Sequence, residues 1–109
     1  MQTTILIISK EHQNEYNIDI DHLIIPSATI IDNNSLSYNN ETYFFDYLFI
    51  DDLKCINNLE IRLEHKKALT NFYLQTSIDN IFALLDANNS NYSLQDELDR
   101  VIDFIKGNE

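Results

Sequence analysis

Short apolar runs separated by polar residues dominate the first half of the chain. The run at 3–8 (TTILII) is rich in β-branched residues and ends at polar residues 9–11. A continuous apolar run of this kind favours a strand that is covered on both faces of its sheet. Two shorter apolar runs, at 22–25 and 28–31, flank Pro26, which cannot donate a hydrogen bond to a neighbouring strand. This pair of runs therefore predicts an edge, a bulge or a bend.

The longest β candidate is the aromatic segment 41–50 (ETYFFDYLFI), which two aspartates at 51–52 bring to an end. Further along, apolar and charged residues alternate over 59–64, which predicts a half-exposed strand. A helix that continues through Ala68 is the alternative for that stretch.

The most regular periodicity lies near the end of the chain, over 93–105. Apolar residues recur there at helical spacing and polar residues fill the opposite side, which predicts an amphipathic helix. Ser93, with Asp96 three positions later, resembles a capping pair, while Lys106 and Gly107 are typical of a helix end. The apolar positions of this helix are Leu94, Leu98, Val101, Ile102 and Ile105.

These patterns together predict an α/β or α+β fold in a small single domain over 1–109. We expect four to five short strands followed by one or two C-terminal helices, with a strand-rich part over 1–64 and a mixed or helical part over 65–109. The chain has 109 residues, of which 44% are apolar, so a small core can form. No apolar run is long enough to cross a membrane, and the single cysteine, Cys55, excludes an internal disulfide. A cytoplasmic location is the resulting expectation.

Charge and glycine content narrow the possible functions. The net charge is −11, with 7 basic and 18 acidic side chains, so direct binding to nucleic-acid phosphates is disfavoured. The one glycine is Gly107, which leaves no glycine-rich loop to cradle a phosphate or a dinucleotide. Asparagine tolerates the left-handed backbone conformation that glycine usually supplies, so pairs of asparagines predict turns. Such pairs lie at 33–34, 39–40, 57–58 and 88–89.

The segment 75–86 (QTSIDNIFALLD) carries the most specific motif in the chain. It resembles the closing flavin-binding segment of the pyridine nucleotide-disulfide oxidoreductases of the thioredoxin-reductase type, whose pattern is roughly Thr-Ser-Val-Pro-Gly-Ile-Phe-Ala-x-Gly-Asp. Residues 46–50 are similar to the Asp-x-Val-Phe-Ile strand that precedes this motif in the family. The matching motif positions are Thr76, Ser77, Ile81, Phe82, Ala83 and Asp86.

The resemblance implies that Asp86 binds a cofactor, since the family's aspartate at this place hydrogen-bonds the ribityl chain of FAD. Asn80 and Leu85 stand where the family has glycines, and the side chain of Leu85 would fill space that glycine leaves open. The family's Gly-x-Gly-x-x-Gly fingerprint and its Cys-x-x-Cys redox pair are both absent from the sequence. We therefore expect a degenerate, truncated relative that is non-catalytic and holds no cofactor.

An EF-hand calcium loop is a rival interpretation of overlapping residues. Asp86, Asn88, Ser90 and Glu97 fall at loop positions 1, 3, 5 and 12, whose side chains bind calcium in that motif. Asn91 stands where the sharp turn of the loop requires glycine, so even a formed loop would bind calcium weakly. The two interpretations differ in structure: the oxidoreductase resemblance predicts a strand over 80–85, and the EF-hand predicts a helix there.

Binding rather than catalysis is the function that we expect from these observations. The oxidoreductase-derived domain would act through protein–protein association or regulation, with a protein partner and without a membrane. The alternative is an acidic inhibitor that mimics nucleic acid, with the acids of 11–21 and 41–52 on its binding face. A homodimer is a further expectation, since the aromatic residues of 43–49 need more cover than so short a chain readily supplies.

Overall fold

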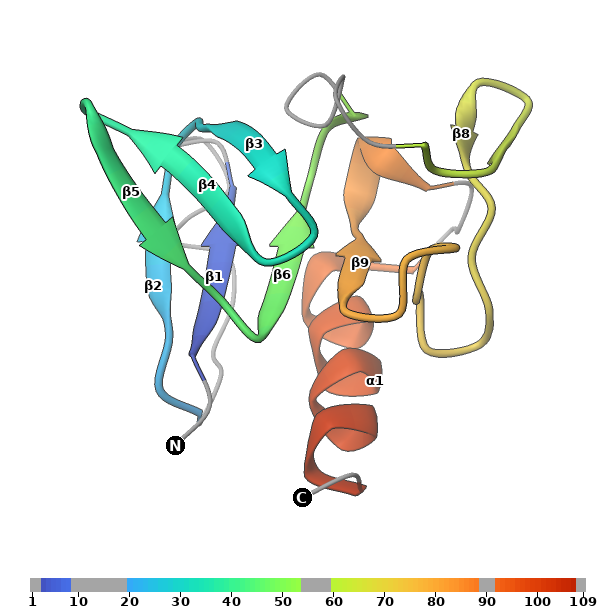
Figure 1. Ribbon diagram of the computed structural model, residues 1–109. Coiled ribbons are helices and arrows are strands. Elements are labelled where there is room, and N and C mark those ends of the chain that lie inside the picture. The colour runs from blue at the N-terminus through green and yellow to red at the C-terminus, as the bar shows by residue number, and fades with distance from the viewer. Residues whose placement is uncertain (1–2, 9–19, 54–59, 89–91, 108–109) are drawn as a thin grey trace.

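A four-stranded parallel sheet forms from the apolar runs of the sequence. The computed structural model describes residues 3–8, 20–53, 60–88 and 92–107. The run at the start forms β1 (Thr4–Ile7), which pairs on one side with β2 (Leu23–Ile25) and on the other with β6 (Tyr47–Ile50). Strand β9 (Ile81–Ala83) pairs with β6, so the order is β2-β1-β6-β9 and every pair is parallel (Figure 1).

An antiparallel meander connects β2 to β6 and lies against one face of the parallel sheet. It consists of β3 (Thr29–Asp32), β4 (Ser35–Tyr38) and β5 (Glu41–Phe44). The asparagine pair at 33–34 lies in the turn between β3 and β4, and the pair at 39–40 turns β4 into β5, as predicted. Asn39 and Asn40 both have positive φ angles, 52° and 64°, which is the conformation that a tight two-residue hairpin turn needs.

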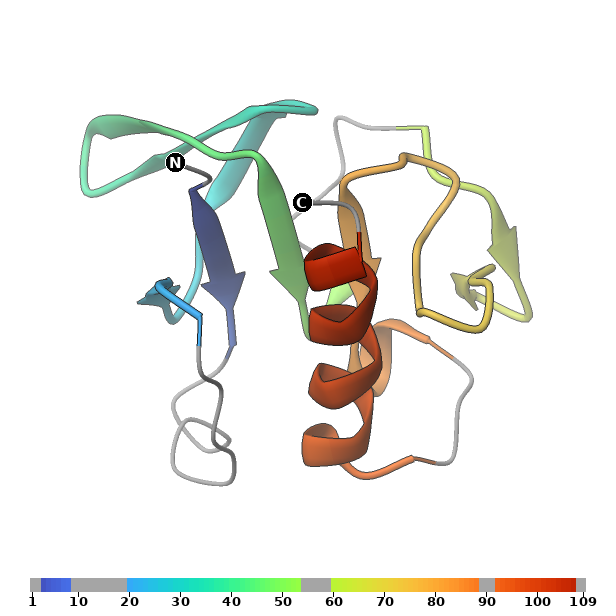
Figure 2. The same ribbon diagram turned by 90° about the horizontal axis from the view of Figure 1, so that it is seen from below.

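The helix α1 (Leu94–Gly107) covers the opposite face of the parallel sheet (Figure 2). Because side chains alternate along a strand, Ile5 and Ile7 of β1 pack toward the meander, while Leu6 packs toward the helix. The predicted helix is confirmed, and all five of its predicted apolar positions are buried. Its first turn is capped by Ser93, whose Oγ accepts a hydrogen bond of 3.2 Å from the backbone N–H of Asp96.

The core between the sheet and the helix is centred on Phe82. This side chain is fully buried in the middle of β9. Its ring centroid lies 6.3 Å from that of Tyr47, 5.6 Å from that of Phe49 and 5.7 Å from that of Phe104. Edge-to-face contacts of this kind add to the stabilisation from apolar burial. The aromatic residues thus hold the helix to the two strands at one side of the sheet.

The single strand predicted over 41–50 is wrong, because the chain changes sheets in its middle. Phe45 and Asp46 separate β5 of the meander from β6 of the parallel sheet. The Asp46 carboxylate accepts a 2.7 Å hydrogen bond from the backbone N–H of Thr3, and the Thr3 carbonyl accepts from the N–H of Asp46. These bonds hold the crossover beside the start of β1. The aromatic character of both halves gave no sign of the break.

The strand predicted over 59–64 is reduced to β7 (Leu63–Glu64), which pairs with β8 (Lys67–Ala68) in a small hairpin. The alternative helix through Ala68 is wrong, since His65 and Lys66 form a turn with positive φ angles of 53° and 67°. The predicted bend at Pro26, between β2 and β3, is confirmed.

The α/β or α+β class is confirmed, with several short strands in sheets and one C-terminal helix. The described residues contain nine strands, more than the predicted four to five, because the expected strands are broken into shorter pieces. Across the described ranges, no helix is long and apolar enough to span a membrane.

Candidate functional site

The carboxyl ends of β1, β6 and β9 meet at one edge of the parallel sheet. The chain winds from β1 outward to β2 and, on the other side, from β6 outward to β9, so the direction of winding reverses between β1 and β6. Ligands of open parallel sheets bind at such a reversal, beyond the carboxyl ends of the strands. Two backbone hydrogen bonds link the strands at this edge. The Asp51 N–H donates to the Ile7 carbonyl at 3.2 Å, and the Leu84 N–H donates to the Ile50 carbonyl at 2.7 Å.

The proposed flavin ligand Asp86 lies directly after β9, in the short 3-10 helix η3 (Leu85–Ala87). Its side chain lies outside the described part of the structure. Leu85, which replaces the glycine of the resembling motif, has a φ of 49°, in the left-handed region that glycine adopts most easily. The Leu85 side chain is half-buried against the core beneath α1. The backbone N–H of Leu85 donates a 2.9 Å hydrogen bond to Glu97 Oε1. The resembling family brings its cofactor close to the backbone at this position, whereas here the backbone N–H forms a hydrogen bond within the protein.

A buried polar network surrounds this position. Glu97 is fully buried, and its Oε2 accepts a 2.5 Å hydrogen bond from Asn88 Nδ2, which also donates to the Ala83 carbonyl at 2.6 Å. Asn88 itself is 4% exposed. The network joins the end of β9, η3 and the first turn of α1. Sequence analysis missed it, although Glu97 lies on the apolar stripe of the helix, one turn from Leu94 and one turn from Val101, and an acid there signals a buried partner.

The EF-hand interpretation does not match the observed secondary structure. The helix that must precede its loop is not present, because residues 81–83 form β9 and hydrogen-bond to β6. Two of the four proposed ligands, Asn88 and Glu97, are bonded to each other, and Ser90 lies outside the described residues. In the described part of the chain, no group of three or more histidine, cysteine, aspartate or glutamate side chains is placed to hold a metal ion.

The acids proposed for a nucleic-acid-mimicking face are divided between two sheets. Glu41 is exposed on the meander, whereas Asp51 lies almost buried at the end of β6. Most of the segment 11–21 lies outside the described residues. The aromatic side chains of the segment 43–49, which predicted self-association, are mostly covered, except Phe44, which is 69% exposed.

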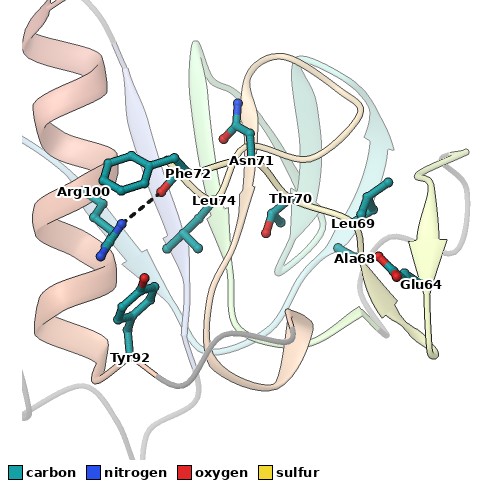
Figure 3. A pocket seen from close by; sticks show the side chains of 9 residues that line it. All are labelled: Glu64, Ala68, Leu69, Thr70, Asn71, Phe72, Leu74, Tyr92 and Arg100. Atoms are coloured by element: carbon teal, nitrogen blue, oxygen red, sulfur yellow. Dashed lines mark hydrogen bonds between the residues drawn. The ribbon is translucent and has the colours of Figure 1, made fainter.

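A second site, which sequence analysis did not predict, is a pocket of about 270 Å³ between the β7–β8 hairpin and α1. The segment 69–74 forms its floor, and Arg100 of α1 and Tyr92 form one wall (Figure 3). Glu64 lies at the far side of the pocket from Arg100. Residues that are far apart in the sequence meet here, so no local motif could reveal the pocket.

The guanidinium of Arg100 lies between two aromatic rings. Its central carbon is 4.3 Å from the ring centroid of Phe72 and 3.8 Å from that of Tyr92. Its Nη1 also approaches the Phe72 carbonyl oxygen, at 3.5 Å. Stacking on both faces fixes the plane of the guanidinium through cation–π attraction. Both rings are strongly exposed, Phe72 at 66% and Tyr92 at 45%, so this assembly faces solvent.

The loop that presents Phe72 is held rigidly by its own polar residues. Asn71 Oδ1 accepts hydrogen bonds from the backbone N–H groups of Tyr73 and Gln75, at 2.9 and 3.1 Å. Leu74 has a φ of 64° and is buried, and its carbonyl accepts a bond from the N–H of Ala83 on β9. A left-handed leucine costs about 1–2 kcal/mol, which its burial offsets. The result is a loop anchored at Leu74 with its aromatic rings directed outward.

A comparison with solved structures gives a distant similarity. No protein-family model matches the chain, and no curated protein matches it. Among solved structures, the chain is similar to a ferredoxin-flavin thioredoxin reductase from Clostridium acetobutylicum, with 15% sequence identity and a TM-score of 0.35. The match covers 95% of this chain and 49% of that protein, so this chain spans about half its length.

Proposed function

We propose that this chain is a non-catalytic binding domain that associates with a protein partner through its pocket face. The pocket face comprises Leu69, Phe72, Tyr73, Tyr92 and Arg100. The observation that carries the proposal is the gathering of exposed aromatic side chains around one arginine, with the exposed Leu69 across the same pocket (Figure 3). Leu69, Phe72 and Tyr92 line the pocket, and Tyr73 packs edge-to-face against Phe72 with ring centroids 5.1 Å apart.

The composition of the pocket face supports protein association. Aromatic residues and arginine are enriched at the centres of protein interfaces and among the residues that contribute most binding energy. The rings of Phe72 and Tyr92 are already held against Arg100, so little side-chain entropy remains to be lost when a partner binds.

The end of β9 supports a role without flavin chemistry. A bound flavin would need close approach to the backbone at Leu85, where the N–H is used by Glu97 and the side chain packs on the core. The chain also has no glycine-rich turn to receive a pyrophosphate. We therefore propose that Asp86 does not serve as a cofactor ligand in this chain.

Site-specific photo-crosslinking tests the partner proposal. A photoreactive phenylalanine analogue at position 72 is expected to crosslink the same partner in repeated captures from the source cells. The same analogue at position 44, which is also exposed but lies on the meander, is the control. Phe72→Ala is expected to abolish capture by the otherwise unmodified chain, and Phe44→Ala to leave it intact. Equal capture by both alanine variants would refute the proposal for this face.

A flavin titration tests the non-catalytic part separately. We expect no change in the absorbance or fluorescence of added FAD. Tight binding, together with reduction of the bound flavin by NADPH, would refute it.

A further inference from the structure

We propose that Arg100 determines which partner the pocket face accepts, and that the partner inserts an aspartate or glutamate side chain into the pocket. This inference rests on the proposed function and adds the chemistry of recognition to it.

Most N–H groups of the Arg100 guanidinium have no hydrogen-bond acceptor among the described residues. The guanidinium carries five N–H bonds, and its one hydrogen bond among the described residues is the 3.5 Å contact with the Phe72 carbonyl. No carboxylate in the described ranges forms an ion pair with it. Because rings cover both of its faces, only its edge can receive a ligand. A carboxylate matches that edge, since its two oxygens can accept two parallel N–H bonds.

The pocket has room for one side chain and not for a cofactor. Its volume, about 270 Å³, lies below the usual range of small-molecule sites. Ala68, Leu69 and Leu74 give it apolar walls, which suit the methylene groups of a glutamate. Thr70 adds a hydroxyl beside the aliphatic walls, whereas the side-chain amide of Asn71 is hydrogen-bonded within its own loop. An apolar stem with a charged end is thus the shape and chemistry that this lining accepts.

Charge near the pocket differs from that of the chain as a whole. The net charge of the whole chain is −11, yet residues 60–75 carry three bases (Arg62, Lys66 and Lys67) against two acids (Glu60 and Glu64). The described lining of the pocket includes Glu64 of this segment but none of its three bases, so the positive charge within the pocket is that of Arg100. Glu64 lies at the other end of the pocket, so it directs an incoming carboxylate toward Arg100 (Figure 3). A single carboxylate of the partner therefore finds its complementary charge at the Arg100 end of the pocket.

Titration with blocked amino acids tests the inference. N-acetyl-glutamate N-methylamide is added to the isotopically labelled full chain, and backbone and Arg Nε–H resonances are followed by NMR. We expect saturable shifts at residues 69–74, Tyr92 and Arg100, and affinity about ten-fold or more weaker for the glutamine analogue. Equal shifts with both probes would overturn the inference.

Three variants separate the role of the Arg100 guanidinium from that of positive charge in general. Arg100→Gln is expected to lose the response to the glutamate probe and the capture of the partner. Arg62→Gln, which removes the same charge outside the pocket lining, is expected to retain both. Arg100→Lys keeps the charge without the planar fork and is expected to bind the probe several-fold more weakly, which covers the case in which Arg100→Gln does not fold. Retention of full probe binding by Arg100→Lys or by a folded Arg100→Gln would overturn the inference.

The two proposals can fail separately. If Phe72→Ala abolishes capture of the partner while the glutamate probe does not bind, the carboxylate inference is wrong and the proposed function stands. If Phe72→Ala leaves capture intact, the proposed function of the pocket face is wrong.

Discussion

Replacing Glu97 by alanine tests whether the buried polar network holds β9, η3 and α1 together. Glu97 is fully buried, and its two carboxyl oxygens accept hydrogen bonds from the Leu85 N–H and from Asn88 Nδ2. The substitution leaves the part-buried Leu85 N–H and one of the two N–H bonds of the buried Asn88 amide without an acceptor, while the Asn88 amide keeps its bond to the Ala83 carbonyl. A buried donor without a partner costs about 1–3 kcal/mol, so we expect the free energy of unfolding to fall by about 3 kcal/mol in total.

This loss of unfolding free energy is large relative to the total stability of a domain of this size, which is about 5–15 kcal/mol. At roughly 4 °C per kcal/mol for a chain near this length, Tm should fall by about 12 °C. Glu97→Gln keeps one acceptor oxygen but turns an NH2 group toward a donor, so its cost should be about half as large. Both costs arise from hydrogen bonds that the protein makes in its interior, so they should persist at high salt.

Urea denaturation followed by circular dichroism measures these changes. Asp96→Ala is the matched control, because Asp96 lies in the same helical turn but is exposed, and only its interaction with the helix dipole, about 0.3–1 kcal/mol, is lost. In a double-mutant cycle, Glu97 and Asn88 should show a coupling of about 1 kcal/mol or more. If Glu97→Ala cost no more than Asp96→Ala, the network would not be a source of stability.

Three further changes have definite expected outcomes. Hydrogen bonds to the Asp32 carboxylate, chiefly from the Asn34 N–H and also from the Ser35 hydroxyl, lower the pKa of Asp32 in the folded protein. The ionised carboxylate therefore stabilises the fold fully above its ordinary pKa, and this stabilisation is lost as the pH falls through the lower folded pKa. Asp32→Asn should remove this dependence and flatten the acid limb of a stability–pH profile. Ser93→Ala removes the N-cap of α1 and should lower the free energy of unfolding by about 1 kcal/mol in urea denaturation, while Ser93→Asp should restore it. Lys66→Gly should raise Tm measured by calorimetry by a few degrees, since glycine adopts the positive φ of that hairpin turn without strain.

The sequence predicted the elements that have a strong periodicity of their own. The C-terminal helix, its cap at Ser93 and the turns at the asparagine pairs 33–34 and 39–40 followed from local rules, because their physical causes lie within a few residues. The division of 41–50 between two sheets did not, since it depends on backbone bonds between Asp46 and Thr3, which are distant in the sequence.

The candidate sites were predicted only where their residues lie close together in the sequence. The motif over 75–86 was visible because its residues are consecutive, whereas the pocket joins Glu64, Phe72 and Arg100 from three separate elements. The burial of Glu97 was accessible in principle, since the acid interrupts the apolar stripe of α1. Its partners, Leu85 and Asn88, could be identified only once η3 and the helix were placed side by side.

The parallel pairing of β1 with β6 affects how the chain folds while it is being synthesised. Ile5 pairs with Leu48, and Leu48 in turn pairs with Ile81, so the first strand leaves the ribosome well before its neighbour. At about 5–20 residues per second, the delay is roughly two to nine seconds. During that interval β1, which is apolar except for Thr4, lacks its pairing with β6, so its side chains must be covered by contacts other than those of the final sheet.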